Sequence, residues 1–254
     1  MMNRKRNFQD FFAIQGVPPN FRCKVAAMTT HIVHHSDKIT LLGGATVDPA
    51  HLRRALEIAP ALVAADGGAD AALAAGCLPE AVIGDFDSIS DAARAAIPDD
   101  RQYRVTEQDS TDFEKCLRHV AARLVLGLGF LGDRFDHGLA ALNALVRNHE
   151  WRCLLIGDDD ICFHCPPDLA LDLPEGMRFS LFPMRPVRGV SEGLHWPIDG
   201  LDFAPGGRIG TSNRVSGPVR LRMEAPGMAV ILPVEALDTA VAALMPPMVA
   251  AASG

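Results

Sequence analysis

The feature that most constrains the fold is a regular alternation of short apolar runs with helical patterns between Lys38 and Ile156. Most of the apolar runs end at glycine or aspartate, and apolar residues then recur at helical spacing. Strands that alternate with helices in this way form right-handed βαβ units, which build a parallel sheet covered by helices on both faces. The predicted strands are 39–42, 61–65, 81–83, 103–105, 124–128 and 153–156, and the predicted helices are 49–59, 69–75, a short one after Ser90, 111–123 and 136–148.

The pattern changes after Asp160, where short apolar runs are separated by proline, glycine and aspartate turns and no helix is indicated before the tail from Val234. Such a pattern is typical of an all-β unit. We therefore predict an α/β fold: an N-terminal three-layer domain with a mostly parallel sheet over residues 37–160, and a C-terminal all-β sandwich domain over 161–254. Residues 1–36 are predicted to be a flexible N-terminal extension, because their basic start and scattered phenylalanines lack a continuous apolar region.

Composition excludes several classes of protein. The 254 residues carry a formal charge of −7, whereas a general nucleic-acid binder needs a basic field. No apolar run approaches the roughly 18 residues that span a bilayer, so we expect no membrane association. Six cysteines are too few for a disulfide scaffold, which favours reduced thiols and a cytoplasmic location. The lone C-x-x-C pair, Cys162 and Cys165, is interpreted as core rather than as a metal or redox site.

Acidic residues follow several of the predicted parallel strands. In open parallel sheets the ligand lies beyond the carboxyl ends of the strands, so these carboxylates should converge there. A single aspartate at a turn is usually a helix cap, but several on one edge would repel each other unless a cation neutralised them. The strand ends in question carry Asp66-Gly67-Gly68, Asp85-x-Asp87, Asp109-x-x-Asp112 and Gly132-Asp133-Arg134-x-Asp136.

Magnesium is the cation that this pattern favours. In extended chain the i, i+2 spacing of Asp85 and Asp87 would point both carboxylates to the same side. Mg²⁺ takes a few carboxylates together with phosphate oxygens, whereas Zn²⁺ would need histidine or cysteine at close spacing. Glycine turns next to helix N-termini suit bound phosphates. The Walker motif is absent, and Gly127-x-Gly129-x-x-Gly132 starts inside a strand, which disfavours a dinucleotide site.

Four blocks taken in series resemble the thiamine pyrophosphokinase family. They are Ala65-Asp66-Gly67-Gly68-Ala69, Ile83-Gly84-Asp85-Phe86-Asp87-Ser88-Ile89, Asp109-Ser110-Thr111-Asp112-Phe113-Glu114-Lys115-Cys116-Leu117 and Gly132-Asp133-Arg134-Phe135-Asp136-His137. Two C-terminal segments, Gly193-Leu194-His195-Trp196 and Gly210-Thr211-Ser212-Asn213, are similar to the family's thiamine-pocket segments. The resemblance covers about residues 39–233.

The resemblance implies a homodimer in which each active site lies between the α/β domain of one subunit and the β domain of the other. It implies Mg-dependent transfer of the pyrophosphoryl group of ATP to the thiamine hydroxyl, which gives thiamine diphosphate and AMP. By motif match, Mg²⁺ would be held by Asp85, Asp87 and Asp112. The nucleotide and the transferred group would be surrounded by Asp66, Gly67, Gly68, Gln108, Asp109, Thr111, Arg134, Asp136 and His137.

Physical chemistry is consistent with these roles. Catalysis would consist mostly of positioning and of charge stabilisation by Mg²⁺ and Arg134, with Asp85 or Asp112 accepting the hydroxyl proton. Trp196 offers a flat face to the cationic thiazolium or its pyrimidine partner, and Ser212 and Asn213 can bond the aminopyrimidine edge. Trp196 as sandwich core and Ser212-Asn213 as a simple turn remain the plain alternatives.

One position departs from the family pattern. Asp133 stands where we expect a small residue before the arginine, so this carboxylate either faces solvent or changes the number of bound metal ions. Two other functions stay open: a metal-dependent phosphohydrolase of a nucleotide or thiamine phosphate, and a non-catalytic module that binds thiamine or nucleotide.

Overall fold

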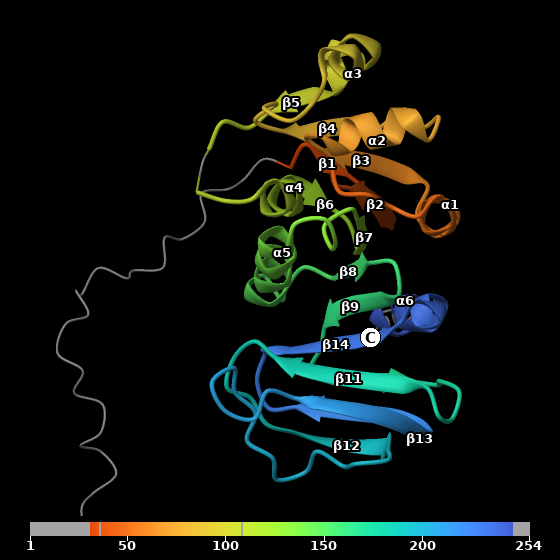
Figure 1. The fold of residues 1–254 in the computed structure, drawn as a ribbon, viewed down its shortest axis with the longest axis vertical. Helices are drawn as coiled ribbons and strands as arrows, with labels where there is room; N and C mark the ends of the chain where they lie inside the picture. The colour runs from red at the N-terminus through yellow and green to blue at the C-terminus, as the bar shows by residue number, and fades with distance from the viewer. Residues whose placement is uncertain (1–30, 36, 108, 246–254) are drawn as a thin grey trace, which may run out of the picture. The chain divides into compact units, whose positions relative to one another are not determined.

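Parallel strands form the first part of the sheet, as the alternating pattern predicts. The computed structural model describes residues 31–35, 37–107 and 109–245 (Figure 1). Across the sheet the strand order is β8-β7-β2-β3-β4-β5, and each neighbouring pair is parallel. These strands are β2 (Lys38–Leu42), β3 (Ala61–Ala65), β4 (Ala81–Gly84), β5 (Gln102–Arg104), β7 (Leu124–Leu128) and β8 (Cys153–Ile156).

Helices cover both faces of this parallel part. Successive strand residues point to opposite faces, so Leu41 and Leu42 belong to different core clusters. Leu42 packs with the helices α1 (Pro49–Ile58) and α2 (Gly68–Ala74), and Leu41 packs with α4 (Asp112–His119) and α5 (Phe135–Arg147). Figure 1 shows α4 and α5 on one side of the sheet and α1 on the other. The predicted three layers are therefore present around the parallel strands.

The remaining helices of the first part are short. Helix α3 (Asp91–Ala96) adds Ala93 to a small cluster with α2, and η2 (Asp99–Arg101) leads into β5. Polar side chains cap three of these helices: the side chains of Asp48, Ser90 and Thr111 accept hydrogen bonds from the backbone N–H groups of Ala50, Ala93 and Glu114, respectively.

Antiparallel strands continue the same sheet. Strand β9 pairs antiparallel with β8, so that the described residues form one 12-stranded mixed sheet. The outer strands are buried on alternate residues, which is typical of a sheet with one solvated face. The elements of this part are β9 (Asp160–His164), β10 (Asp168–Leu171), β11 (Arg178–Pro183), β12 (Gly189–Leu194), β13 (Thr211–Met223), β14 (Met228–Pro233), η3 (Val234–Ala236) and α6 (Leu237–Leu244).

Four features differ from the sequence-based expectation. The helix predicted over 111–123 ends at His119, because β6 (Val120–Ala121) leaves it to pair with β1 (Val33–His34). Strand β1 lies within the predicted extension 1–36, whose residues 1–30 and 36 lie outside the described residues. Strand β12 was not predicted, and β13 runs over 13 residues where the sequence indicates only short apolar runs, because it pairs with β11 before it reaches β10.

The C-x-x-C pair is confirmed as core. Cys162 and Cys165 are 3% and 1% exposed, and burial raises the pKa of each thiol to about 12. Such groups stay protonated at neutral pH, whereas metal binding and thiol exchange need the thiolate. Within the described ranges, no helix combines the length and the apolar character that crossing a bilayer requires.

Candidate active site

A cavity of about 820 Å³ opens at the carboxyl ends of the parallel strands. The chain runs from β2 outward to β5 and then returns to place β7 on the other side of β2, so the connections diverge between β2 and β7. A crevice forms at such a switch point, and ligands of open α/β sheets bind there. The loops after β2, β3, β4 and β7 all contribute to the lining, through Gly43, Asp66, Asp85 and Gly129 among others.

Asp66 is the most deeply buried carboxylate of the cavity. It follows β3 directly, adopts a positive φ of 42° and is 1% exposed. Its Oδ1 accepts a hydrogen bond of 3.1 Å from the N–H of Ile89, but its buried Oδ2 has no hydrogen-bond partner in the described structure. Burial raises the pKa of this carboxyl to about 6, and the charge of Asp112 adds to the rise. Oδ2 is thus available to a cation.

A glycine makes room for this carboxylate. A Cβ atom at Gly84 would lie 2.8 Å from the Cβ of Asp66, which real structures do not tolerate. The glycine that ends β4 in the sequence block Gly84-Asp85 therefore lets the β3 and β4 strand ends approach each other. The acidic residues that follow both strands come together as a consequence.

Asp85 and Asp87 join Asp66 through a turn. We expected extended chain here, but that was wrong: Phe86 between them has a φ of 67°, so the backbone turns after β4. One oxygen of each of the three carboxylates lies within 4.8 Å of the others, which is close enough to share an ion. Asp87 is also bonded by the Ser88 hydroxyl at 2.8 Å.

Lys115 links this cluster to Asp112. Its side chain is only 4% exposed, and its Nζ lies 3.0 Å from Asp85 Oδ2 and 2.9 Å from Asp112 Oδ1. The ammonium holds the pKa of the Asp85 carboxyl below its usual value. Sequence reasoning missed Lys115, although its position three residues after Asp112 on a predicted helix places both side chains on one face.

Asp112 reaches the cavity because α4 begins there. Thr111 caps the helix by accepting from the Glu114 N–H at 3.3 Å, so Asp112 is the first helical residue. The Glu114 side chain does not complete a capping box; it bonds Arg118 and Arg147 instead. The contact between Glu114 and Arg147 fixes α4 against α5. The first turn of α5 forms the opposite wall of the cavity.

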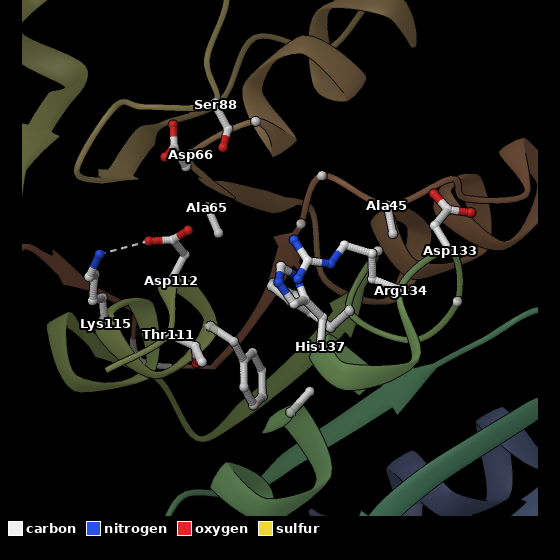
Figure 2. Close-up of a pocket in the computed structure, with 18 of the residues that line it drawn as sticks. Ala45, Ala65, Asp66, Ser88, Thr111, Asp112, Lys115, Asp133, Arg134 and His137 are labelled. Carbon is white, nitrogen blue, oxygen red and sulfur yellow. Dashed lines mark hydrogen bonds and ion pairs between the residues drawn. The ribbon is translucent and has the colours of Figure 1, made fainter. Parts of the chain in front are cut away.

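Basic side chains stand across from the acids. Figure 2 shows Arg134 and His137 facing Asp66 and Asp112 across the pocket. Arg134 immediately precedes α5, and its guanidinium bonds both oxygens of Asp136, at 3.2 Å through Nε and 2.5 Å through Nη2. Both side chains are well exposed, so the pair is held weakly and Arg134 can turn toward an anion in the cavity.

The donor set fits a hard divalent cation. Asp66, Asp85 and Asp87 offer only carboxylate oxygens, the ligands that Mg²⁺ prefers, and Asp66 Oδ2 is buried without a partner. Three carboxylates at such distances repel each other unless they are neutralised, and Lys115 supplies only one positive charge. A bound Mg²⁺ would offset most of the remaining negative charge of these carboxylates and Asp112.

The structure brings most of the expected α/β site residues together. The cavity lining includes seven of them: Asp66, Gly67, Asp85, Thr111, Asp112, Arg134 and His137. Asp87 belongs to the acid cluster, and Gly68 is the first residue of α2. Asp109 and Asp136 are exposed residues that do not belong to the lining, and Gln108 lies outside the described residues.

The three expected thiamine-pocket residues lie in the antiparallel part and do not line the cavity. Trp196 is 53% exposed, so its interpretation as sandwich core is wrong. Ser212 and Asn213 lie in strand β13, so the alternative of a simple turn is also wrong. Asn213 is buried, and its amide is engaged by the Trp196 backbone: Oδ1 accepts from Trp196 N at 3.1 Å, and Nδ2 donates to Trp196 O at 2.6 Å.

Comparison with known proteins identifies what the chain is similar to. Residues 52–155 match the family described as "Thiamin pyrophosphokinase, catalytic domain". Thiamine pyrophosphokinase 1 of Oryza sativa subsp. japonica is 31% identical over 160 residues, which cover 54% of this chain and 59% of the relative. Thiamine pyrophosphokinase 2 of Arabidopsis thaliana is 30% identical over 160 residues, with 54% and 58% covered. The match thus spans somewhat more than half the length of these relatives.

The fold is shared with solved structures. The thiamin pyrophosphokinase of Geobacillus thermodenitrificans superposes with a TM-score of 0.65 at 20% sequence identity, and the match covers 77% of this chain and 96% of that one. At this identity the likeness concerns the fold, and it extends well beyond residues 52–155 into the antiparallel part.

Proposed function

The chain belongs to the thiamine pyrophosphokinase family through residues 52–155, and on this basis we propose that it transfers the pyrophosphoryl group of ATP to the hydroxyl of thiamine, giving thiamine diphosphate and AMP. The observation that carries the proposal is the cavity at the sheet edge, where an acidic cluster stands across from Arg134. An acidic wall for a cation and a basic wall for phosphate oxygens are the two requirements of phosphoryl-group transfer.

We propose Mg²⁺ as the cation. Asp66, Asp85 and Asp87 would hold it, and Asp112 can join them where its contact with Lys115 opens. When bound, Mg²⁺ supplies positive charge that offsets the charge of the triphosphate. Lys115 keeps Asp85 ionised and turned toward the cluster, which preserves the site before the cation binds.

The nucleotide is proposed to lie along the strand-end loops. Gly67 presents backbone at the start of α2, whose positive end favours phosphate, and Thr111 and His137 border the same space. Arg134 stabilises the charge of the transferred group, while Asp136 holds its guanidinium until the anion arrives. Gly68, Gln108 and Asp109 keep the nucleotide-binding role that the family pattern gives them.

A carboxylate must accept the proton of the thiamine hydroxyl. Asp85 is the weaker candidate, because it belongs to the acid cluster proposed to hold the cation and its side chain is only 16% exposed. Asp112 is 36% exposed at the cavity and is therefore accessible to the hydroxyl. We propose Asp112 as the group that accepts the proton, with the remaining catalysis coming from alignment of the hydroxyl with the β-phosphorus.

The second substrate is proposed to bind through a homodimer. Trp196, Ser212 and Asn213 are the proposed thiamine contacts, and none of them lines the cavity of its own chain. Phe135 and Leu139 on α5 are exposed next to the cavity, at 80% and 50%. Apolar residues in such positions favour a partner surface. We propose that residues 161–254 of a second copy, acting as a thiamine-binding and dimerisation domain, close the site formed by residues 37–160.

The direct test is a product analysis. Purified protein is incubated with ATP, Mg²⁺ and thiamine, and the expected products are thiamine diphosphate and AMP in equal amounts. Omitting thiamine or chelating Mg²⁺ should abolish AMP release. Phosphate release without thiamine would instead identify a phosphohydrolase, and binding of either ligand without any product would identify a non-catalytic module.

The location of the protein is proposed to be cytoplasmic. Its described cysteines are free thiols, and four of them are buried, which suits a reducing compartment.

A further inference from the structure

Asp133 makes a specific contact that the proposed function does not use. Its Oδ2 accepts two hydrogen bonds from one residue of a distant loop: 2.9 Å from the backbone N–H of Thr46 and 3.1 Å from the Thr46 hydroxyl. These bonds hold the pKa of the Asp133 carboxyl below its usual value. A charged acceptor that receives two donors is a stronger contact than most exposed hydrogen bonds.

The contact is the outermost of a series of hydrogen bonds between two loops, and we call this series the seam. Loop 43–48 follows β2 and loop 129–134 follows β7, and both contribute to the cavity lining. The Gly43 N–H donates to Leu128 O at 2.7 Å, and the Ala45 N–H donates to Gly129 O at 3.2 Å. Thr46 with Asp133 is the next link outward in this series.

The inner end of the seam is tightly packed. A Cβ atom at Gly43 would lie 2.5 Å from Gly129 O, and one at Gly129 would lie 2.5 Å from Gly43 O. The two loops therefore touch backbone to backbone at this point, and they can separate only at their outer ends. Asp133 lies at the outer end, next to Arg134.

The Asp133 carboxylate does not enter the acidic cluster. Asp133 belongs to the cavity lining, but in Figure 2 its carboxylate lies on the side of Ala45, far from Asp112, whereas the guanidinium of the adjacent Arg134 extends toward the middle of the pocket. Asp133 is exposed, as the first of the two expectations for this residue has it, and it does not add a ligand to the described acid cluster; its carboxylate is nevertheless bonded to Thr46. The two adjacent side chains have different partners: Asp133 bonds Thr46, and Arg134 bonds Asp136.

We infer that Asp133 is a positioning residue: its double hydrogen bond to Thr46 fixes loop 129–134 on loop 43–48 and thereby sets Arg134 in place to receive a nucleotide phosphate. This inference rests on the proposed nucleotide-binding role of the cavity. The hydrogen-bond acceptor at position 133 fixes the two loops together, and its negative charge is not required for this role.

The test compares Asp133→Ala with Asp133→Asn by measuring the affinity for a fluorescent, non-hydrolysable ATP analogue in Mg²⁺. Asp133→Ala should weaken binding about three- to tenfold, the effect of losing an exposed, charge-assisted hydrogen bond. Asp133→Asn keeps an acceptor oxygen and should stay within about twofold of the unchanged protein. In turnover assays, Asp133→Ala should raise KM for ATP and lower kcat, because Arg134 also stabilises the transferred group, while KM for thiamine stays unchanged.

Two controls separate the outcomes. Thr46→Val removes the hydroxyl but keeps the backbone donor, and should give an intermediate loss; Asp172→Ala changes an exposed aspartate after β10 and should have no effect. Two results would overturn this inference and leave the proposed function standing. One is that Asp133→Ala binds the ATP analogue as tightly as the unchanged protein. The other is that Asp133→Asn binds the analogue as weakly as Asp133→Ala. Absence of nucleotide binding by the unchanged protein overturns the proposed function, and this inference with it.

Discussion

The charge of Lys115 is shared by two carboxylates, those of Asp85 and Asp112. We expect Lys115→Met to lower the free energy of unfolding by about 1–3 kcal/mol in the absence of divalent cations, because it leaves Asp85 and Asp112 without their shared counter-charge. Mg²⁺ should recover more stability in this variant than in the unchanged protein. Urea unfolding with and without Mg²⁺ measures both effects.

The matched control for this prediction is Lys38→Met. Lys38 also pairs with an aspartate, Asp37, but that carboxylate is 57% exposed, so the pair should contribute less than about 1 kcal/mol. Equal losses for the two variants would show that the Lys115 contacts have no special role in stability.

Asn213 and Trp196 should act as one unit in thiamine binding. Trp196→Ala should weaken thiamine binding about two- to thirtyfold, the range of a cation–π contact, and leave ATP affinity unchanged. Asn213→Ala should reproduce this loss, because the Asn213 amide holds both the N–H and the carbonyl of Trp196. Isothermal titration with each ligand separately is the measurement, and equal losses of both ligands would make the two residues purely structural.

At the scale of elements, the junction of β9 with the β14 hairpin predicts a dependence on pH. His164 ends β9, and its Nε2 accepts a hydrogen bond of 3.1 Å from the Gly227 N–H, a role that requires the neutral ring. Burial lowers the pKa of His164 to about 4, and His149 and Arg185 add to the effect. The unfolded chain therefore binds more protons than the folded one between about pH 4 and 6.5.

The direction in which stability changes with pH follows from this difference in bound protons. Stability should be fully present above about pH 6.5 and should fall by up to about 3 kcal/mol as the pH drops to about 4. His164→Gln supplies an acceptor that does not titrate, so its stability should fall less over the same range. Urea midpoints between pH 4.5 and 7.5 compare the two proteins, and parallel curves would contradict the assignment to His164.

Element types were easier to predict than element ends. The parallel strands were found because their apolar runs end at glycine or aspartate, and the caps that the structure has at Asp48, Ser90 and Thr111 lie at or next to the starts predicted for these helices. The end of α4 was missed because the pairing of Val120 with Val33 is a contact between distant residues, which no local pattern reports. The pairing that extends β13 was missed for the same reason.

The candidate site was predictable to a similar degree. Aspartates at successive strand ends predicted a shared acidic edge, and Asp66, Asp85 and Asp87 do meet there. The turn at Phe86 was not predictable, because its positive φ is rare for a non-glycine residue and is imposed by the surrounding structure. The engagement of Asp133 by Thr46 likewise depends on two loops that are 87 residues apart in the chain.

At the scale of the whole molecule, the proposed shared active site predicts complementation. Asp85→Asn and Trp196→Ala damage different halves of the site, so each homodimer should be inactive at low thiamine concentration. After mixing and exchange of protomers, one intact site should form in each mixed dimer, which restores about a quarter of the original activity in a closed two-fold dimer. No recovery after demonstrated exchange would place both halves of the site in one chain.

The central claim is that carboxylates from separate strand ends hold one divalent cation against a nucleotide. Mn²⁺ is the appropriate probe, since its electron paramagnetic resonance signal reports binding directly and the same oxygen ligands suit it. We predict that the unchanged protein binds Mn²⁺ tightly in the presence of a non-hydrolysable ATP analogue. Asp85→Asn should weaken that binding at least about tenfold without unfolding the protein. Mn²⁺ affinity that is the same in both proteins would contradict the account.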